Sequence, residues 1–396
     1  MKSGKFFHAV LFLALCAGCG SGSSTPVVTP TPPPAPTTVN ALAVTVNGSL
    51  CSPGSYPNKA CVSVTVCTPG TTDCQTVNDI LLDTGSAGLR IFKQVLTIPL
   101  TQVASSSGSL AECIQFADGT SGWGPVQMAD VTLGNEPAVQ VPVHVLDSTF
   151  ATVPGSCGTP QSGPSAARYN GLLGVGIFAQ DCGPTCVQSG LNNWYFSCTG
   201  TNCSGTNVLL AHQVQNPVAL LPQDNNGVII QLPAIPLGGA PFANGQLLFG
   251  IGTRSNNSPS GATAYPASST GEFTTTFNGT STPGFIDTGS NGLFMGNPSP
   301  SLPPCAAPNS GWFCPPATVS LTATNTGAGG SPSGVVPFQI GNAIALFSTT
   351  NKVFAELGGT LPVGFDWGLP FFYGRDVAIG IEGRSSSLGT GPYWAY

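Results

Sequence analysis

The stretch that decides the fold is ILLDTGSAGL, residues 80–89, which returns later in the chain as FIDTGSNGL, residues 285–293. In each copy an apolar run leads into Asp-Thr-Gly-Ser, and a Gly-Leu pair follows. A chain of this composition contains one such tetrapeptide by chance on the order of 1% of the time. Two copies with matching flanks are therefore not accidental. In a chain with only 16 acidic residues, they predict that Asp83 and Asp287 meet and act together.

The residues around each aspartate suit a fixed carboxylate. The apolar residues before Asp83 and Asp287 predict short buried strands that end at the aspartate. A glycine two positions later permits a tight turn and a close backbone approach, and the Ser and Thr hydroxyls can hydrogen-bond the carboxylate. Two carboxylates about 3 Å apart cannot both ionise readily, so they share a proton. One can then act as a base on water while the other donates a hydrogen bond to a carbonyl.

Length and composition predict an all-β protein with two lobes. The 396 residues suffice for two cores. The 52 Gly, the 37 Pro and the recurring short Val, Ile, Thr and Phe runs favour strands over helices. With one Asp-Thr-Gly-Ser loop in each half, we expect an N-terminal β lobe over residues 39–239, a C-terminal β lobe over residues 240–396, and a cleft between them.

Charge and histidine content argue against other classes of function. Without the two lysines of the N-terminal signal, the formal charge is −8 and no basic patch is present. Nucleic acid is therefore not an expected partner. His144 and His212 lie in apolar or amide-rich surroundings without a nucleophile-elbow motif, which argues against a Ser-His-Asp triad. We interpret both as buried or surface histidines with satisfied hydrogen bonds.

The N-terminus has the pattern of an export signal. Two lysines precede the apolar run of residues 6–15, which is too short to remain as a membrane-spanning helix. The following Ala-Gly-Cys resembles a bacterial lipoprotein cleavage box, so we expect a signal peptide over residues 1–19 with lipidation at Cys19. The alternative is an ordinary secretory signal cleaved nearby. Residues 20–38 predict a Pro/Thr/Ser tether. The expected location is the bacterial cell envelope, lipid-anchored, most simply at the outer membrane and facing the periplasm or exterior.

The remaining cysteines predict a disulfide framework. Removing the two cysteines of the signal from the total of 14 leaves an even number in an exported chain. Cys67 and Cys74 flank a hairpin turn, and Cys305 and Cys314 flank a loop in the second half, so both are candidate pairs. The spacings 182/186 and 198/203 leave a zinc site as an alternative, but no histidine lies nearby. We expect disulfides there and no metal or other cofactor.

The order of motifs resembles that of the pepsin-like aspartic peptidases, in a bacterial lipoprotein version. The resemblance covers roughly residues 40–396. Between and after the two loops come four segments that resemble, in order, the flap hairpin, the apolar-Gly segment, the strand that opens the second lobe, and the closing apolar-Gly with its turn and strand. They are IQFADGTSGWGPVQMADVTLGN (114–135), YNGLLGVG (169–176), ANGQLLFGIG (243–252) and FDWGLPFFYGRDVAIGIEG (365–383).

The resemblance implies a role for each loop residue. Asp83 and Asp287 would be the catalytic dyad of an endopeptidase that activates a water on a polypeptide substrate. The supporting residues would hydrogen-bond the outer carboxylate oxygens (Ser86, Ser290), grip the opposite loop (Thr84, Thr288) and supply N–H groups near the shared water (Gly85, Gly289). The flap and substrate cleft would include Phe116, Asp118, Gly119 and Thr120. We expect a monomer, because two loops in one chain make a covalent pseudo-dimer and leave no need for a single-lobe, retroviral-type dimer.

Two departures fall at the flap. Phe116 stands where family members usually have a tyrosine, and Arg90 stands where a tryptophan commonly supports that tyrosine. We therefore expect flap closure to work differently here. Phe116 either lines the groove or clamps substrate, and Asp118 is interpreted as a turn-capping residue. Arg90 is expected in a salt bridge, at the surface or in contact with substrate. The alternative function is a non-catalytic binding or scaffold lipoprotein, although such proteins usually lose one catalytic aspartate.

Overall fold

The computed structural model describes residues 38–296 and 302–396. Strands dominate this part of the chain, so the expected all-β class is confirmed. None of its helices is long and apolar enough to cross a membrane. The expected signal peptide with Cys19, and all but the last residue of the expected tether, lie outside the described residues. The short helices are α1 (Pro164–Ala167), α2 (Pro184–Gln188), α3 (Ala343–Phe347), η1 (Lys93–Val95), η2 (Gly155–Cys157), η3 (Leu210–His212), η4 (Pro217–Leu220) and η5 (Leu369–Phe372).

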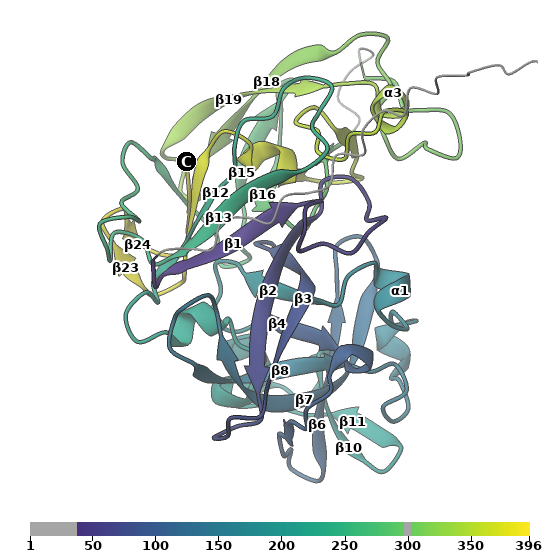
Figure 1. Ribbon diagram of the computed structural model, residues 1–396, viewed down its shortest axis with the longest axis vertical. Coiled ribbons are helices and arrows are strands. Elements are labelled where there is room, and N and C mark those ends of the chain that lie inside the picture. Colours follow the sequence, from purple (N-terminus) through teal and green to yellow (C-terminus); the bar gives the residue numbers. More distant parts are fainter. Residues whose placement is uncertain (1–37, 297–301) are drawn as a thin grey trace, which may run out of the picture.

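Six strands of the first half form a closed ring, in the lower part of Figure 1. Their order is β2-β3-β9-β4-β8-β7, and β7 pairs again with β2. The strands β5 and β6 each pair with β7, and β10 and β11 extend the sheet beyond β6. The strands are β2 (Ala60–Cys67), β3 (Cys74–Asp83), β4 (Ala87–Phe92), β5 (Thr101–Gln102), β6 (Ser109–Gln115), β7 (Ser121–Thr132), β8 (Val139–Leu146), β9 (Gly171–Val175), β10 (Tyr195–Thr199) and β11 (Asn202–Gly205).

Six further strands link the two halves of the molecule. β1 pairs with β2 on one side and with β13 on the other, and the order continues through β12, β22, β25 and β14. In Figure 1, β1, β12 and β13 lie between the lower and upper parts. The segment expected to open the second lobe is thus part of a sheet that both halves share, and the division at residues 239/240 stays a prediction. The strands are β1 (Ala41–Val46), β12 (Gly227–Gln231), β13 (Ala243–Phe249), β14 (Ala264–Pro266), β22 (Asp376–Gly380) and β25 (Tyr393–Ala395).

The second half carries a separate seven-stranded sheet, in the upper part of Figure 1. Its order is β19-β18-β15-β16-β21-β17-β20, and a small hairpin of β23 and β24 stands apart. The expected two-lobed β architecture is therefore confirmed. The strands are β15 (Phe273–Phe277), β16 (Thr280–Asp287), β17 (Leu293–Met295), β18 (Val319–Thr326), β19 (Ser333–Ile340), β20 (Gly358–Thr360), β21 (Phe365–Gly368), β23 (Ser385–Ser386) and β24 (Gly389–Thr390).

Apolar and polar contacts both tie the lobes together. One cluster of buried apolar side chains runs from the ring strands through β12 and β13 into β16 and β21. A buried polar contact adds to it. The Asn58 side chain donates to the Phe354 carbonyl at 2.8 Å and accepts from the Phe354 N–H and the Tyr373 hydroxyl, each at 2.8 Å. Satisfied buried polar groups of this kind fix relative positions, because separating them would leave amides unpaired.

Six disulfides close loops within the described residues. The expected pairs Cys67–Cys74 and Cys305–Cys314 are confirmed. The cysteines considered for zinc are bridged as 182–186 and 198–203, so the zinc alternative is wrong. The other two bridges join Cys51 to Cys61 and Cys113 to Cys157. Each bridge joins residues of the same lobe, so the arrangement of the lobes rests on packing and hydrogen bonds.

Candidate active site

Each aspartate ends a strand that is braced by a parallel neighbour. β3 ends at Asp83, and its partner strand β9 places Gly174 opposite. β16 ends at Asp287, and β21 places Gly368 opposite. The expected strands, loops and apolar-Gly segments are thus all present, once in each lobe. The glycines are needed because a Cβ on Gly368 would lie 2.1 Å from the Gly292 carbonyl oxygen.

The two loops meet closely enough that glycine is required at their tips. A Cβ on Gly85 would lie 2.8 Å from Cγ of Asp287, and a Cβ on Gly289 would lie 2.9 Å from Oδ1 of Asp83. Real Cβ contacts of this length do not occur, so each glycine lets the opposite carboxylate approach the backbone. The sequence therefore brings both aspartates into one site, as expected.

The threonines hold the two loops together through a reciprocal set of hydrogen bonds. Thr84 Oγ1 donates to the Ile286 carbonyl at 2.9 Å and accepts from the Thr288 N–H at 3.0 Å. Thr288 Oγ1 donates to the Leu82 carbonyl at 2.7 Å and accepts from the Thr84 N–H at 3.1 Å. Both side chains are buried, at 1% and 0% exposure. Each threonine thus bonds one carbonyl and one N–H of the opposite lobe, and the four bonds make the expected grip across the lobes.

The carboxylates are fixed from outside and share a donor inside. Ser86 donates to Asp83 Oδ2 at 2.5 Å, and Ser290 donates to Asp287 Oδ2 at 2.8 Å. The inner oxygens, Oδ1 of both aspartates, accept from the Gly85 N–H at 2.8 and 3.1 Å. The N–H of Gly289 donates to Asp287 Oδ1 at 2.7 Å. Because one N–H reaches both inner oxygens, the two carboxyls lie side by side.

The electrostatics of the pair favour a shared proton. Burial raises the pKa of Asp83 well above its usual range, and the charge of Asp287 and a hydrogen bond with it raise the pKa further. Hydrogen bonds from Ser86 and Gly85 lower it in part. Asp83 is 5% exposed, whereas Asp287 is half-buried, so Asp83 is the member that desolvation keeps protonated. A neutral acid beside a carboxylate is the arrangement that can give and take a proton in one step.

A cleft of about 410 Å³ surrounds the pair and takes residues from both lobes. One wall of the cleft is the tip of the β6–β7 hairpin, where the Phe116 N–H donates to the Thr120 carbonyl at 2.9 Å. Phe116, Asp118 and Thr120 line the cleft as expected, whereas Gly119 forms the exposed turn with φ +84°. Asp118 also caps that turn, because its Oδ1 accepts from the Thr120 N–H at 2.9 Å. Phe116 packs against an apolar cluster that includes Tyr169, and it lines the groove.

Several cleft residues were missed at the level of sequence. Tyr56 reaches the cleft from the loop between β1 and β2, inside the Cys51–Cys61 disulfide. Burial raises the pKa of Tyr56, and the carboxyls of Asp79, Asp287 and Asp83 raise it further, so its hydroxyl stays protonated beside the pair. The second lobe contributes the aromatic and amide side chains Phe285, Asn291 and Phe294. No local motif marks Tyr56, because its loop joins the site only after the lobes pack.

Of the three roles expected for Arg90, the structure shows the salt bridge and not the surface position or the substrate contact. Its side chain is fully buried, so it neither lies at the surface nor contacts substrate. It forms the expected salt bridge, to Glu112 at 2.8 Å and to Asp181 at 2.9 Å. A buried guanidinium requires such partners. His144 joins the same cluster at 3.2 Å from Glu112, and burial lowers the pKa of His144 to about 4, so it is neutral in ordinary conditions.

One set of described residues has the spacing of metal ligands, but all three members are already engaged with other groups. Cys51, Cys61 and Asp79 place ligand atoms within 4.8 Å of one another. The two sulfurs are joined in a disulfide, and Asp79 pairs with the buried Lys59 at 2.5 Å. Neutral disulfide sulfurs are poor ligands compared with thiolates. This cluster therefore does not fit a metal ion.

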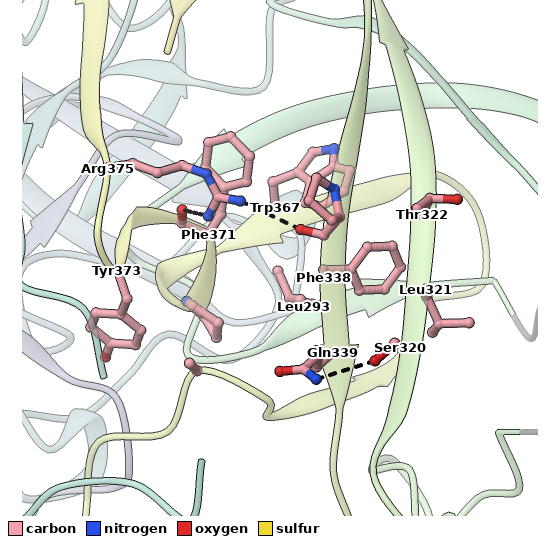
Figure 2. Close-up of a pocket in the computed structure, with 13 residues that line it drawn as sticks. Leu293, Ser320, Leu321, Thr322, Phe338, Gln339, Trp367, Phe371, Tyr373 and Arg375 are labelled. Atoms are coloured by element: carbon pink, nitrogen blue, oxygen red, sulfur yellow. Dashed lines mark hydrogen bonds between the residues drawn. The ribbon is translucent and has the colours of Figure 1, made fainter. Parts of the chain in front are cut away.

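A second cavity, of about 490 Å³, lies in the second lobe away from both aspartates (Figure 2). Figure 2 shows Trp367, Phe338 and Phe371 on its walls, with Arg375 at one side. The Arg375 guanidinium lies 4.6 Å from the Phe371 ring and donates to the Phe371 and Pro337 carbonyls. Two of its N–H donors are thus already used within the protein. The paired carboxyls of Asp83 and Asp287 line the cleft and not this cavity.

A third carboxyl lies behind the pair. Asp366 is on β21, two residues before Gly368, and is 5% exposed. Burial raises the pKa of Asp366 well above its usual range; the charge of Asp287 raises it further, a hydrogen bond with Ser290 lowers it, and the charge of Asp83 raises it again. The sequence carries a signal for this residue, since an acid inside an apolar strand is rare in so weakly charged a chain.

Comparisons with known proteins extend this description. The family profile described as "Protein of unknown function (DUF3443)" matches residues 36–396. A search of the curated proteins found no match. Among solved structures, the crystal structure of aspartic proteinase from Irpex lacteus is similar, with 16% sequence identity, a TM-score of 0.48, and coverage of 90% of this chain and 96% of that chain.

Proposed function

The chain belongs to the family described as protein of unknown function DUF3443, and we propose that it is an aspartic-type endopeptidase with Asp83 and Asp287 as the catalytic residues. The observation that carries the proposal is the single Gly85 N–H that reaches the inner oxygens of both carboxyls, at 2.8 and 3.1 Å. Such proximity lets two acids hold one proton between them. The hydrogen bonds of the supporting serines, threonines and glycines support the proposal, because they are the contacts that the resemblance to pepsin-like peptidases implies.

The arrangement supports a different role for each of the two carboxyls. Asp83, kept neutral by burial, donates its proton toward the oxygen of a substrate carbonyl. Asp287, as the carboxylate, takes a proton from a water held between the inner oxygens, and that water's oxygen bonds to the carbonyl carbon. When the tetrahedral intermediate breaks, the proton on Asp287 passes to the leaving amine nitrogen as the C–N bond cleaves. The remaining hydroxyl returns a proton to Asp83, which restores the starting state.

The cleft around the pair suits an extended polypeptide. It takes residues from the flap hairpin, from the β1–β2 loop and from the second lobe. Its aromatic side chains offer apolar contact for substrate side chains. They are Tyr56, Phe116, Tyr169, Phe285 and Phe294. Because Phe116 has no hydroxyl, the flap would close over substrate by apolar packing of Phe116 against its cluster rather than by a flap hydrogen bond. No cofactor takes part in this proposal.

Export to the cell envelope completes the proposal. The signal pattern of residues 1–19, with lipidation at Cys19, would anchor a monomeric peptidase to a membrane through its lipid, with the tether of residues 20–38 as spacer. The six disulfides of the described residues are compatible with an oxidising compartment outside the cytoplasm. Its expected substrates are polypeptides of that compartment.

A binding or scaffold lipoprotein is the competing proposal, and one experiment separates the two. The purified protein is incubated with a denatured protein mixture between pH 3 and pH 7, with and without a statine-type inhibitor, and new peptide termini are identified by mass spectrometry. Cleavage that is strongest in mildly acidic solution and blocked by the inhibitor is expected. If the protein cleaves nothing at any pH but retains a peptide or polysaccharide ligand, the binding alternative replaces the peptidase.

A further inference from the structure

Among the residues paired directly before the two aspartates, the second lobe has one carboxyl and the first lobe has none. In the first lobe, β3 and β9 place Leu81 opposite Leu172, two residues before Asp83. In the second lobe, β16 and β21 place Phe285 opposite Asp366, two residues before Asp287. Asp366 thus occupies the place that Leu172 holds in the first lobe. A carboxyl has replaced an apolar side chain on only one side of the pair.

Strand geometry directs Asp366 toward the cleft side of its sheet. Its neighbour Trp367 lies on the wall of the second cavity (Figure 2), and successive side chains of a strand point to opposite faces. The residues opposite Asp366 on the two flanking strands are Phe285 and Phe294, and both line the cleft. Side chains that are directly opposite share a face. Asp366 therefore lies between the two phenylalanines, on the same face as Asp287.

The surroundings of Asp366 leave its carboxyl poorly satisfied. Within the described chain its Oδ1 is buried and has no hydrogen-bond partner, and no lysine or arginine pairs with it. The charged groups that face it are Asp287 at the end of β16 and Asp83 in the opposite loop, while β17 contributes the uncharged Phe294. A buried carboxyl with only negative neighbours is stable when it keeps its proton.

Ser290 connects Asp366 to the reacting pair. The Ser290 hydroxyl donates to Asp287 Oδ2 at 2.8 Å, and its interaction with Asp366 lowers the pKa of that carboxyl. A hydroxyl has one proton but two acceptor lone pairs. When Asp366 is neutral, its O–H can donate to Ser290, which leaves the Ser290 proton for Asp287. When Asp366 is ionised, the two carboxylates compete for that proton.

We propose that Asp366 is a positioning residue that acts through Ser290 on Asp287 and sets the upper pH limit of hydrolysis. In its neutral form it keeps the Ser290 hydrogen bond on Asp287, so Asp287 is oriented as the base. Loss of the Asp366 proton frees Ser290 to turn toward Asp366 and places a third negative charge beside the pair. The active form of the site is therefore three carboxyls that hold two protons. This inference rests on the proposed peptidase activity.

The pH dependence of kcat/KM tests the proposal. Asp366→Asn keeps a donor toward Ser290 but cannot ionise, and Asp366→Leu reproduces the side chain found at the matching place in the first lobe. Both variants should move the upper limb of the pH profile to higher pH, by about one unit, the size of coupling between adjacent carboxyls. Asp366→Asn, which retains a donor toward Ser290, should also keep kcat/KM at acidic pH. Glu136→Gln, which changes a buried carboxyl remote from the cleft, should leave the profile in place. If both Asp366 variants retain the wild-type upper limb, the proposal is wrong.

Thermal stability gives a readout that does not depend on hydrolysis. A buried acid with a raised pKa binds its proton more tightly in the folded state, so the wild type should lose stability as pH rises above about 4. Asp366→Asn lacks this loss, and its Tm advantage over the wild type should grow between pH 4 and pH 7. A Tm difference that is constant over this range overturns the titration of Asp366. If the Tm difference grows with pH but the wild type cleaves no peptide, the proposed peptidase activity is wrong, whereas the titration of the buried Asp366 is supported.

Discussion

Replacing Thr288 by valine tests whether the threonine grip holds the two lobes together. Valine has nearly the same shape, but it removes the hydrogen bond to the Leu82 carbonyl at 2.7 Å and the one from the Thr84 N–H at 3.1 Å. Thr288 is fully buried, so both backbone groups lose a partner without gaining water. Each unsatisfied buried group costs about 1–3 kcal/mol, which predicts a loss of about 2–6 kcal/mol in the free energy of unfolding.

The assay is urea unfolding followed by circular dichroism, with the disulfides intact. Thr280→Val is the matched control, because Thr280 is an exposed residue at the start of the same strand, β16. Surface substitutions of this kind change stability by less than about 0.5 kcal/mol. A Thr288→Val protein that is as stable as Thr280→Val, within that margin, would refute the reasoning that the grip carries the interface.

Three further predictions concern other buried groups. Arg90→Met should lower the free energy of unfolding by about 3–5 kcal/mol, because it leaves the buried carboxyls of Glu112 and Asp181 without a cation. In the same urea assay Lys93→Met, at an ion pair whose lysine is 63% exposed, should lower it by less than about 1 kcal/mol. Because a disulfide that closes a longer loop restricts the unfolded chain more, replacing Cys113 and Cys157, 44 residues apart, by alanine should lower the free energy of unfolding by about 4 kcal/mol. The same replacement of the bridge 198–203, whose cysteines are 5 residues apart, should lower it by about 2 kcal/mol, and equal losses would contradict this argument. Burial, together with a hydrogen bond and the charge of Asp224, raises the pKa of Glu136 from 4.5 to about 7. Between these values the folded state keeps a proton that the unfolded state releases, so the stability of the wild type should fall as pH rises, and the Tm of Glu136→Gln should change less with pH.

The features that the sequence predicted are those set by local pattern. Asp-Thr-Gly-Ser after an apolar run predicts a strand that ends at a fixed carboxylate, and two copies predict a pair. Short loops bounded by cysteines predicted the bridges of Cys67 to Cys74 and Cys305 to Cys314. The flap hairpin and both apolar-Gly strands were also found, because each has its own turn or glycine signal.

The features that the sequence left open depend on contacts between distant segments. The burial of Arg90 follows from Asp181, which lies 91 residues away and meets it only in the folded lobe. Tyr56 enters the cleft because the nearby Asn58 donates to the carbonyl of Phe354 in the second lobe, 296 residues further along the chain. The sheet that joins β1 to β13 makes the lobe boundary a shared structure rather than a linker. Asp366 was within reach of sequence analysis, but an isolated acid in a strand has no meaning until its neighbours across the sheet are known.

The most direct test of the account is peptide hydrolysis by Asp83→Asn and Asp287→Asn, measured beside the wild type at mildly acidic pH. Asparagine is nearly isosteric with aspartate, but it can neither take a proton from water nor present one. Each variant should keep the wild-type circular dichroism spectrum and lose at least about 10²–10⁴-fold in kcat/KM, the usual contribution of acid–base catalysis. Because residues that act as a unit lose function together, the double variant should be no worse than either single one. Hydrolysis at the wild-type rate by either single variant would contradict the paired-carboxyl mechanism.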